Sequence, residues 1–529
     1  MKPSICKAIA LTGIFYFIPA AQAQFASQIG LTLLRETTTN LNGSGIRVAQ
    51  PEAYDLGTTN WEVNPSAVGQ PVTLFKYFSS GGTSTSYPNT LSGASGHAAG
   101  VGQNFYGIPS GVSTNVEHMD NLDANYFYGN YVAMFSLPSI GDAIVNQSFT
   151  FGPQTISIQQ SIDTQYDNYS VKNKTLFISA ANNYGNSANV CAPGTSYNCI
   201  SVGAYQNGSF GNSLGPTPDN GRCKPDITAL SGETSFSTPQ VAGAAALLMQ
   251  AALRGDGGGD TNSASDMRMI KALLLNGAVK PGGWTNSNSS PLDARYGAGV
   301  LNVFNSYQQL AGGKCGYIIS TTVASGGAHP PTGDAGTVSS LNGWDFNTNT
   351  SVSVPLAEDA VNHYYFNATN GPGNVIATAT LVWNRQENQT GINNLDLFLY
   401  NCASSNLVTC STSRVDNVEH IFTPNLPPGR YDLQVWKAGG LGIVSAAEPY
   451  ALAFSFTSPT LALAKSGTNL NLSWPVYPAG FLAEASTNLT SGTWSTNNLP
   501  EPIITNGQNV IWLNATNASQ FFRLRMPNL

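Results

Sequence analysis

The sequence predicts an α/β protein with a doubly wound parallel sheet, followed by two all-β domains. Residues 45–311 alternate short β-rich runs with helical patterns, which is typical of a parallel sheet covered by helices. After Gly313 the chain changes to alternating strand patterns with turns between them. At 529 residues the chain is long enough for about three domains. We expect the α/β domain at residues 24–313, a β-sandwich at 314–457 and a smaller β domain at 458–529.

The individual elements follow from the local patterns. In the first domain the expected strands are Ile46–Gln50, Ala143–Ser148, Thr175–Ala181 and Cys199–Ala204. The expected helices are Ile158–Tyr169, Phe236–Leu253 and Asp266–Ala278, the last with Ser265 as its cap. Later strands are expected at Ala377–Trp383, Leu395–Tyr400, Tyr431–Trp436, Leu470–Trp474 and Val510–Leu513. Because sites of open α/β sheets lie beyond the carboxyl ends of the strands, functional side chains are expected there.

The amino terminus has the pattern of a secretory signal peptide over residues 1–23. Lys2 and Lys7 flank the start of an apolar run, and Ala21-Gln22-Ala23 provides a small-residue cleavage site. No later apolar run approaches the ~18 residues of a membrane span, so a secreted, soluble monomer is expected. The net charge is −7 and becomes more negative when the two lysines leave. Nucleic acids and anionic membranes are therefore disfavoured as partners.

Six cysteines follow the signal segment: Cys191, Cys199, Cys223, Cys315, Cys402 and Cys410. Disulfides are expected in an exported protein, although the sequence alone cannot choose among the pairings. Close spacing favours Cys191 with Cys199 and Cys402 with Cys410, which leaves Cys223 with Cys315. No spacing of cysteines and histidines resembles a zinc site.

A serine shortly before a proline opens the strongest helical pattern of the chain. Residues 234–243 read TSFSTPQVAG and continue into an Ala- and Leu-rich run. Because proline is tolerated early in a helix, Ser235 is expected at or near a helix N-terminus. Free backbone N–H groups and the helix dipole favour a developing anion there, which suits a nucleophilic serine. The alternative is an N-cap serine on a buried helix.

These residues resemble the nucleophile motif of the subtilisin-like serine peptidases (subtilases), with Glu233 where the family has glycine. Other segments resemble family landmarks in the right order; they are Ile144–Phe149, Ile200–Ala204, Lys224–Ile227 and Tyr296–Val303. Each motif is weak by itself, but the ordered set over roughly residues 40–311 is a strong signal. The resemblance implies a subtilisin-like fold and the hydrolysis of peptide bonds in a protein or peptide substrate.

The resemblance also implies a carboxylate after the first strand, which orients the catalytic histidine. Glu52 falls at this position, where the family has aspartate. A glutamate can accept the hydrogen bond from the imidazole Nδ1, although its side chain is one methylene longer. Asp55 is the competing candidate, and a solvated surface acid is the third interpretation.

His97 lies in a run of small residues and loosely resembles the histidine motif of the subtilases. Ala99 and Gly100 stand where the family has threonine and a second histidine. In this register His97 is the general base. In a second register His97 is the family's second histidine and Ala94 takes the catalytic position, which would imply an inactive protein.

Three further site residues follow from the resemblance. Asn183 matches the asparagine whose amide donates into the oxyanion hole, with a turn asparagine as the alternative. Ser148 ends a strand whose edge is expected to pair with extended substrate. Glu233 lies on the pocket side, where it would attract a basic side chain or block the pocket. The segment between Asp226 and Ser235, which forms one pocket wall in the family, is nearly absent.

Together these residues predict a secreted serine endopeptidase. Ser235 would attack the scissile carbonyl, and His97 would act as base and then as acid, oriented by Glu52. One alternative is a catalytically inactive binding or adhesion protein on the same scaffold, favoured by Glu52, Ala99 and Glu233. Another is an acid peptidase of the sedolisin type, which would not use His97.

The β domains resemble modules that are appended to exported bacterial proteins. Residues 394–399 resemble a strand of the jelly-roll sandwiches that follow many subtilase domains. The resemblance allows a structural calcium ion, for which Asp396 is a candidate ligand, with a surface or turn aspartate as the alternative. No cofactor is required for the expected reaction, and no set of calcium ligands can be read from the sequence.

Overall fold

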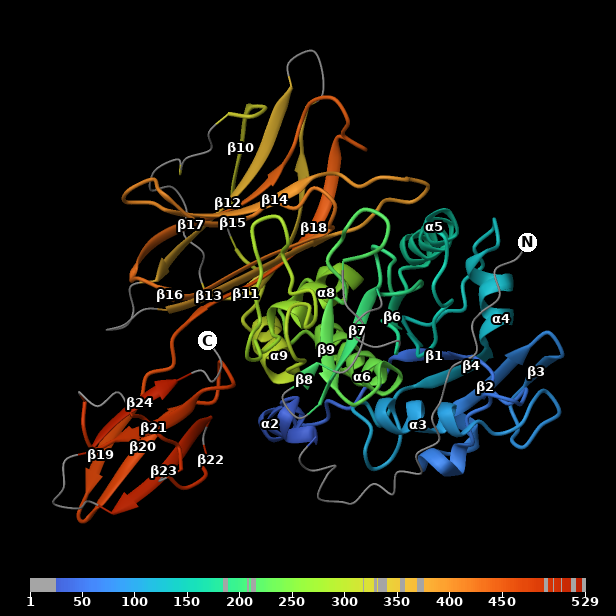
Figure 1. Ribbon diagram of the computed structural model, residues 1–529, viewed down its shortest axis with the longest axis horizontal. Coiled ribbons are helices and arrows are strands. Elements are labelled where there is room, and N and C mark those ends of the chain that lie inside the picture. Colours follow the sequence, from blue (N-terminus) through green and yellow to red (C-terminus); the bar gives the residue numbers. More distant parts are fainter. Residues whose placement is uncertain are drawn as a thin grey trace.

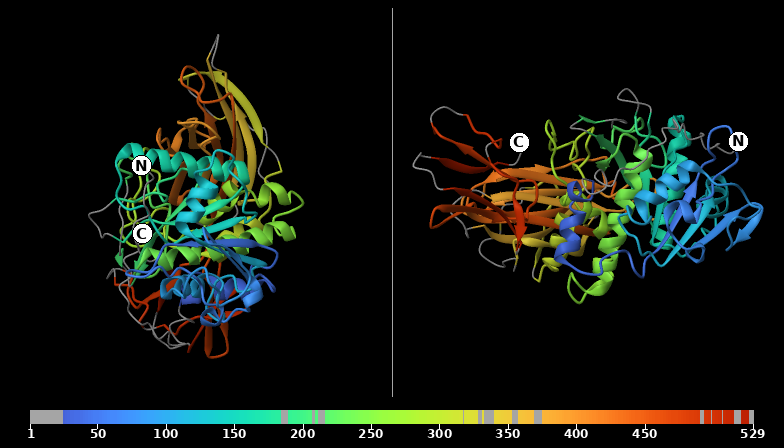
Figure 2. Two further views of the ribbon diagram at one scale, coloured as in Figure 1. Left: turned by 90° about the vertical axis from the view of Figure 1, so that its right-hand side faces the viewer. Right: turned by 90° about the horizontal axis from the view of Figure 1, so that it is seen from below.

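The computed structural model describes residues 25–183, 189–206, 209–210, 216–316, 318–327, 331, 340–352, 357–368, 375–489, 493–497, 499–505, 507–514 and 520–525. The expected signal peptide, residues 1–23, lies outside this part of the chain. Within it, no helix is both long enough and apolar enough to cross a membrane. The smallest β unit lies at one end of the long axis and strand β3 at the other (Figures 1 and 2).

A mixed nine-stranded sheet forms the centre of the first domain, as the sequence predicts. Its order is β3-β2-β4-β1-β5-β6-β7-β8, with β9 beside β7. The inner strands pair in parallel, and only β3 and β8 pair antiparallel. The strands are β1 (Arg47–Glu52), β2 (Phe75–Ser79), β3 (Gly82–Ser84), β4 (His118–Asp123), β5 (Ile144–Gln147), β6 (Leu176–Ala180), β7 (Ile200–Gln206), β8 (Ser209–Phe210) and β9 (Ile227–Leu230).

Helices cover both faces of this sheet. Alternate strand residues enter different cores, since Val48 packs in one hydrophobic cluster and Ala49 in another. The first cluster contains residues of α2 (Leu31–Thr37), α3 (Gly96–Phe105), α6 (Thr234–Arg254), α8 (Met267–Asn276) and α9 (Val303–Ala311). The second contains residues of α4 (Ala124–Phe127), the π-helical turn η3 (Tyr128–Val132) and α5 (Ile156–Asn173). Shorter helical turns are η1 (Pro65–Val68), η2 (Val72–Leu74) and α7 (Thr261–Ala264).

Helix α6 is the central helix of the domain and packs against β5, β6 and β7. Seventeen of its residues are buried, which fits its Ala-rich sequence. It begins at Thr234, so Ser235 lies in the first turn as expected, whereas Pro239 lies in the second turn. The predicted cap of α8 was wrong by one residue, because the Asp266 side chain, and not Ser265, accepts the hydrogen bond from the Arg268 N–H.

Two antiparallel sheets form the β-sandwich of the middle region. One has the order β10-β12-β17-β14-β15 and the other β11-β18-β13-β16, and apolar side chains of both fill the space between them. Their strands are β10 (Ile319–Ala324), β11 (Asn342–Thr350), β12 (Glu358–Ala368), β13 (Val375–Trp383), β14 (Leu395–Asn401), β15 (Leu407–Ser411), β16 (Val418–Leu426), β17 (Gly429–Lys437) and β18 (Ala447–Thr457).

The last region is a small β unit with a core of its own around Leu472, Trp474 and Ile511. It contains a four-stranded sheet, β19-β20-β23-β22, and the pair β21-β24. Its strands are β19 (Ala462–Ser466), β20 (Asn469–Pro475), β21 (Leu482–Ser486), β22 (Ile503–Thr505), β23 (Gln508–Asn514) and β24 (Phe521–Arg525). The prediction of two appended all-β regions is thus confirmed.

The sandwich packs tightly against the α/β domain. A guanidinium nitrogen of Arg385 lies 2.6 Å from the buried Asp167 carboxylate of α5. The Asn198 amide bonds the main chain of Arg385 in both directions, at 3.0 and 2.9 Å. An oxygen of Asp416 accepts from the Cys223 N–H at 2.7 Å. One buried ion pair and several hydrogen bonds thus join the sandwich to the α/β domain.

The expected disulfides do not form. Cys199, Cys223 and Cys410, one member of each expected pair, are free thiols. Cys410 pairs with Phe398 in the β14–β15 hairpin. Phe398 precedes Cys402 by four residues, so the Cα atoms of the two cysteines lie about 13 Å apart along the strand direction. A disulfide requires Cα atoms within about 7 Å. Cys199 instead directs its sulfur at the Ser196 carbonyl, 3.1 Å away.

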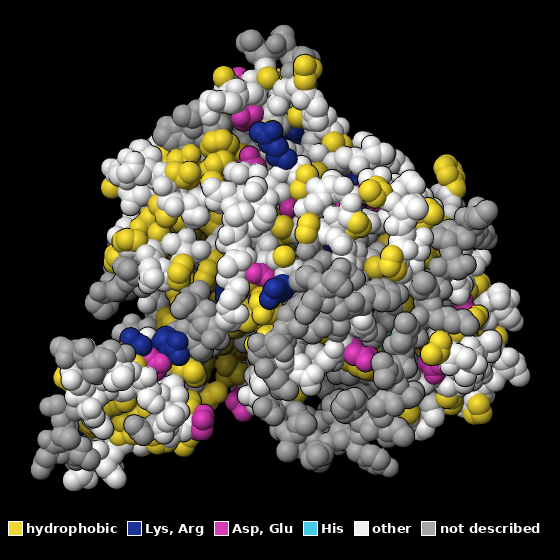
Figure 3. Space-filling model, viewed as in Figure 1, with side chains coloured by type: hydrophobic (Ala, Val, Ile, Leu, Met, Phe, Trp, Pro, Cys, Tyr) yellow, Lys and Arg dark blue, Asp and Glu magenta, His cyan; other side chains and the backbone are white. Residues whose placement is uncertain are grey.

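Charged side chains are sparse on the surface. Only 10% of all residues are charged, and the face in Figure 3 shows few of them among the uncharged polar side chains. Local concentrations of charge are therefore informative in this protein.

Candidate active site

Glu52 and His97 meet at the carboxyl end of the sheet. Glu52 is the last residue of β1 and His97 lies in the first turn of α3, which the Ser95 side chain caps. The Glu52 Oε2 lies 2.9 Å from Nδ1 of His97, and both side chains are almost completely buried. The other ring nitrogen, Nε2, has no hydrogen-bond partner among the described residues. The carboxylate therefore fixes the ring, and Nε2 is left to accept a proton.

Asp55, the competing candidate, has a different role in the structure. Its Oδ1 accepts from the Ser95 hydroxyl at 2.7 Å, and its Oδ2 accepts from the Gly96 N–H at 3.0 Å. Asp55 thus binds the N-terminus of α3, where the helix dipole favours a negative charge. The geometry pairs His97 with Glu52. Ala94, the catalytic position of the second register, precedes the helix in a bridge with Glu62.

Hydrogen bonds among buried polar side chains hold Glu52 in place. The amide nitrogen of Gln50 donates to Glu52 Oε1 at 2.8 Å and to the Ala98 carbonyl at 3.0 Å. The Tyr106 hydroxyl donates to the side-chain amide oxygen of Gln50 at 2.7 Å. Both carboxylate oxygens of Glu52 are therefore occupied, and its longer side chain is fixed in one position.

Ser235 is buried in the first turn of α6, next in sequence to a residue that contacts His97. The ring of its neighbour Phe236 lies 5.9 Å from that of His97, centre to centre. The Ser235 hydroxyl donates to the Ser148 carbonyl at 3.3 Å and makes no hydrogen bond with His97 within the described chain. Proton transfer to His97 would require the hydroxyl to leave this bond.

Asn183 lies at the N-terminus of the same helix. Its side-chain oxygen accepts from the N–H and the hydroxyl of Thr234, both at 2.9 Å. This fixes the amide, so that its NH₂ group remains available as a donor. The Ser235 N–H is also without a partner in the described part of the chain. Two donors thus flank the serine, as an oxyanion site requires.

Ser148 lies just beyond β5 and is buried. Its hydroxyl donates to the Ser235 carbonyl at 2.8 Å. β5 pairs with β6 along its whole length, but with β1 only at Ile144 and Val145. A substrate edge is thus excluded at Ile144 and Val145, and the prediction stands for the chain that follows them.

Glu233 is half-buried, and its carboxylate lies close enough to His97 for the two charges to interact. Burial raises the pKa of Glu233, and the histidine lowers it in part. Burial lowers the pKa of His97, but Glu52, Asp55 and Glu233 stabilise the imidazolium and raise the pKa above 6.5 overall. Only residues 231–233 connect β9 to α6, so the pocket wall is as short as the sequence indicated.

Gly100 explains one departure from the family motif. A Cβ atom at this position would lie 2.8 Å from the Phe236 ring. The glycine thus makes room for the aromatic side chain that contacts His97. No group of three or more His, Cys, Asp or Glu side chains that could hold a metal ion exists in the described part.

The sheet, the helix N-terminus and the clustered side chains define the class of fold, that of a subtilisin-like serine peptidase. Residues 127–299 match the model of the subtilase family, which confirms the family resemblance. The match includes Ser148, Asn183, Glu233 and Ser235, whereas Glu52 and His97 lie before it.

Two solved structures are similar to this chain at low sequence identity. Tripeptidyl peptidase 2 is 12% identical at a TM-score of 0.32, with 74% of this chain and 43% of that chain covered. The epidermin leader peptide processing serine protease of Staphylococcus aureus is 14% identical at a TM-score of 0.33, with 58% of this chain and 84% of that chain covered. This chain thus spans less than half of the length of tripeptidyl peptidase 2. No curated protein matches the chain.

Sequence reasoning missed the residues that support the site. Gln50 could have been found, because it lies two residues before Glu52 and so on the same face of the strand. Tyr106 and Phe236 had no such signal, since their contacts depend on how α3 and α6 pack together.

Proposed function

We propose that this protein is an exported serine endopeptidase that hydrolyses peptide bonds through an acyl-enzyme. The observation that carries the proposal is the 2.9 Å contact between Glu52 and His97, which leaves Nε2 unpartnered in a ring that contacts Phe236, the residue after Ser235. The family match supports the class of reaction. The expected signal peptide at residues 1–23 supports export.

In the first step the Ser235 hydroxyl turns to His97 and loses its proton to Nε2 as the oxygen attacks the scissile carbonyl. Glu52 stabilises the imidazolium that forms. The tetrahedral oxyanion is held by the Asn183 amide and the Ser235 N–H. When the intermediate collapses, the imidazolium gives its proton to the leaving amine. Water then hydrolyses the ester by the same route in reverse.

Glu233 favours substrates with a basic side chain near the scissile bond. It is half-buried beside the site, and its side chain makes no capping bond to α6. A guanidinium or ammonium group would lower the energy of this desolvated carboxylate. Peptides with Arg or Lys are therefore expected to be cleaved faster than matched peptides with Glu.

A fluorophosphonate probe tests the proposal. Labelling is expected at Ser235, with loss in Ser235→Ala and strong reduction in His97→Ala. Ser157→Ala, on the exposed surface of α5, serves as the matched control. Folded wild-type protein that takes no label would instead support the inactive scaffold. Labelling that is confined to low pH and survives His97→Ala would support the acid-peptidase alternative.

A further inference from the structure

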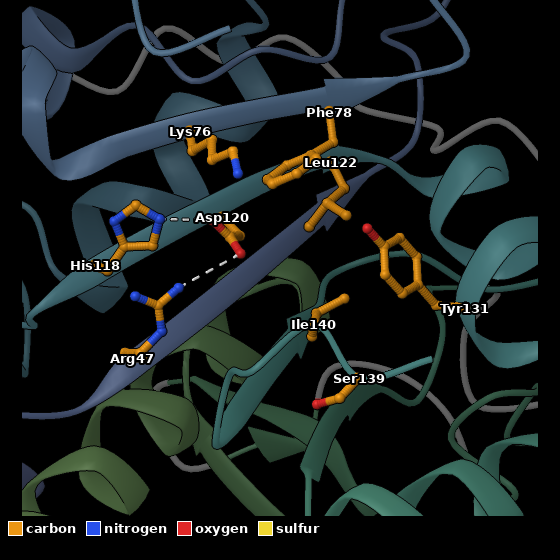
Figure 4. A pocket seen from close by; sticks show the side chains of 9 residues that line it. All are labelled: Arg47, Lys76, Phe78, His118, Asp120, Leu122, Tyr131, Ser139 and Ile140. Carbon is orange, nitrogen blue, oxygen red and sulfur yellow. Dashed lines mark hydrogen bonds and ion pairs between the residues drawn. The ribbon is translucent and has the colours of Figure 1, made fainter. Parts of the chain in front are cut away.

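A hollow lies in the α/β domain, away from the candidate active site. It has a volume of about 430 Å³ and is lined by residues of β1, β2, β4 and the segment before β5. Its size lies within the range of small-molecule sites, roughly 300–1,000 Å³. Figure 4 shows the lining side chains converging from several elements on one space.

The hollow lies at the opposite end of β1 from the active site. Arg47 begins the strand and lines the hollow, whereas Glu52 ends it and contacts His97. The strand rise places these two positions about 16 Å apart. The hollow is also on the sheet face covered by α4 and η3, because its lining residue Leu122 belongs to their hydrophobic cluster.

This part of the sheet is open because the connection between β4 and β5 contains little helix. Only α4 and η3, nine residues together, lie between Asp123 and Ile144. Helix α4 packs against β1, β2 and β4 but leaves Arg47, Lys76 and His118 to line the hollow. Side chains at the beginnings of three strands therefore face the hollow.

More basic than acidic side chains line the hollow. Arg47, Lys76 and His118 lie on one side of it (Figure 4). Asp120 accepts from His118 at 2.7 Å and lies 3.9 Å from Arg47. Lys76 has no ion-pair partner in the described chain, and its ammonium lies 4.7 Å from the Phe78 ring.

A second acid, Asp142, lies 3.8 Å from Arg47 but does not neutralise it. Asp142 is buried, and neither of its oxygens has a hydrogen-bond partner in the described chain. Burial and then the neighbouring Asp120 raise its pKa to about 9. The raised pKa favours the neutral form of Asp142, so its pairing with Arg47 is weakened. Among the lining residues, Arg47 and Lys76 face the single carboxylate of Asp120.

The opposite side of the hollow carries apolar side chains together with Ser139 and the Tyr131 hydroxyl (Figure 4). Leu122, Tyr131 and Ile140 line it, and Phe78 extends it toward the lysine. Figure 4 shows these side chains grouped on the side away from Arg47 and His118. A ligand that fills the whole space thus needs an anionic end and an apolar body.

We propose that this hollow is a binding site for a small amphiphilic anion, namely a carboxylate or phosphate attached to an aromatic or aliphatic group. The anion lies between Arg47 and Lys76. The apolar body lies against Leu122, Tyr131 and Ile140. The protein is acidic overall, so the selection of an anion depends on these local charges.

Titration calorimetry with 3-phenylpropionate tests the proposal on the full-length protein. Saturable binding is expected, at least about tenfold tighter than for 3-phenylpropanamide, because the amide lacks the charge-assisted hydrogen bonds. Inorganic phosphate as a third probe shows whether the anionic end is sufficient without the apolar body. Equal binding of the acid and the amide, or no saturable binding of the acid, would overturn the proposal.

Two variants locate the site. Lys76→Met is expected to weaken 3-phenylpropionate binding about tenfold or more, whereas Lys172→Met, at an exposed lysine of α5, leaves it unchanged. Ser235→Ala must retain wild-type affinity, since the active site is at the other end of the strands. Loss of binding in Ser235→Ala, with retention in Lys76→Met, would assign the ligand to the peptidase site and refute the second site. Failure of catalysis does not affect this test.

Discussion

Ser148 and Ser235 are joined by two hydrogen bonds that run in opposite directions. The Ser148 hydroxyl donates to the Ser235 carbonyl at 2.8 Å, and the Ser235 hydroxyl donates to the Ser148 carbonyl at 3.3 Å. The first bond has a clear cause. Pro239 lies four residues after Ser235 and has no N–H, so the helix cannot satisfy that carbonyl. Ser148 supplies the missing donor and fixes the helix against the end of β5.

We therefore expect Ser148→Ala to destabilise the protein by about 1–3 kcal/mol, because a buried carbonyl loses its partner. The rate of fluorophosphonate labelling should fall as well, since the first turn of α6 loses its anchor. Denaturant unfolding and labelling kinetics measure the two effects. Ser157→Ala should change neither, and a Ser148→Ala variant with unchanged stability would contradict this role.

The length of the Glu52 side chain is expected to be essential. In Glu52→Asp the carboxylate retreats by about 1.5 Å, one C–C bond, and the 2.9 Å contact with His97 is lost. The expected decrease in kcat/KM is about 10²-fold. Glu52→Gln keeps the shape but removes the charge and favours the wrong tautomer, so a decrease of about 10⁴-fold is expected. Steady-state kinetics on a chromogenic peptide measure both. An aspartate variant that equals the wild type would show that Glu52 is not the orienting group.

The pH dependence should reflect the three carboxylates around His97. Their combined effect raises the pKa of the histidine above 6.5, so the acidic limb of kcat/KM should lie above pH 6.5. Glu233→Gln removes one negative charge, which destabilises the imidazolium. His97 then remains neutral down to a lower pH, so the acidic limb of kcat/KM should move to lower pH.

Glu36→Gln, at an exposed position on α2, is the control and should leave the limb in place. A limb that moves to higher pH in Glu233→Gln, or does not move, would contradict the proposed interaction. Activity that rises continuously toward acid would contradict the use of His97 as a base.

The parts that could be predicted from the sequence are those set by local patterns. Apolar runs located β5, β6 and β7, and the Ala-rich run located α6, because burial on both sides demands such composition. The small residues around His97 concealed helix α3, since glycine and alanine give little periodic signal. Glu52 was placed by resemblance and not by any local pattern.

What remained unpredictable depends on contacts between distant segments. The role of Asp55 required the N-terminus of α3 to lie beside it, 40 residues later in the chain. The hollow beside Arg47 and Lys76 results from a short connection between β4 and β5. That this connection leaves a space is visible only once the strands are placed side by side. The cysteine spacings were misleading, because a short loop between two cysteines does not fix the strand register.

Glu62 should make the stability of the protein depend on pH. The segment ahead of α3 is anchored here, since the Ser95 N–H donates to the Glu62 carbonyl at 2.9 Å. The Glu62 side chain is completely buried, with Oε1 unpartnered in the described chain. Burial raises its pKa from 4.5 to about 7, although the Asn89 amide opposes this shift.

The raised pKa means that folding favours the protonated acid. Below pH 4.5 Glu62 is protonated in both states and has no effect on stability. Between pH 4.5 and 7 the unfolded state ionises first, and the free energy of unfolding falls. Above pH 7 the full loss, about 3 kcal/mol, is present. Glu62→Gln cannot ionise, so its stability relative to wild type should increase over this range by up to the same amount.

Urea unfolding at pH 4, 6 and 8 measures this difference. Glu117→Gln, at an exposed glutamate before β4, should show no such trend and serves as the control. The test uses only the change with pH, because the amide also alters the bond to Asn89 by a constant amount. A Glu62→Gln variant that loses stability relative to wild type as the pH rises would show that Glu62 is ionised in the folded protein.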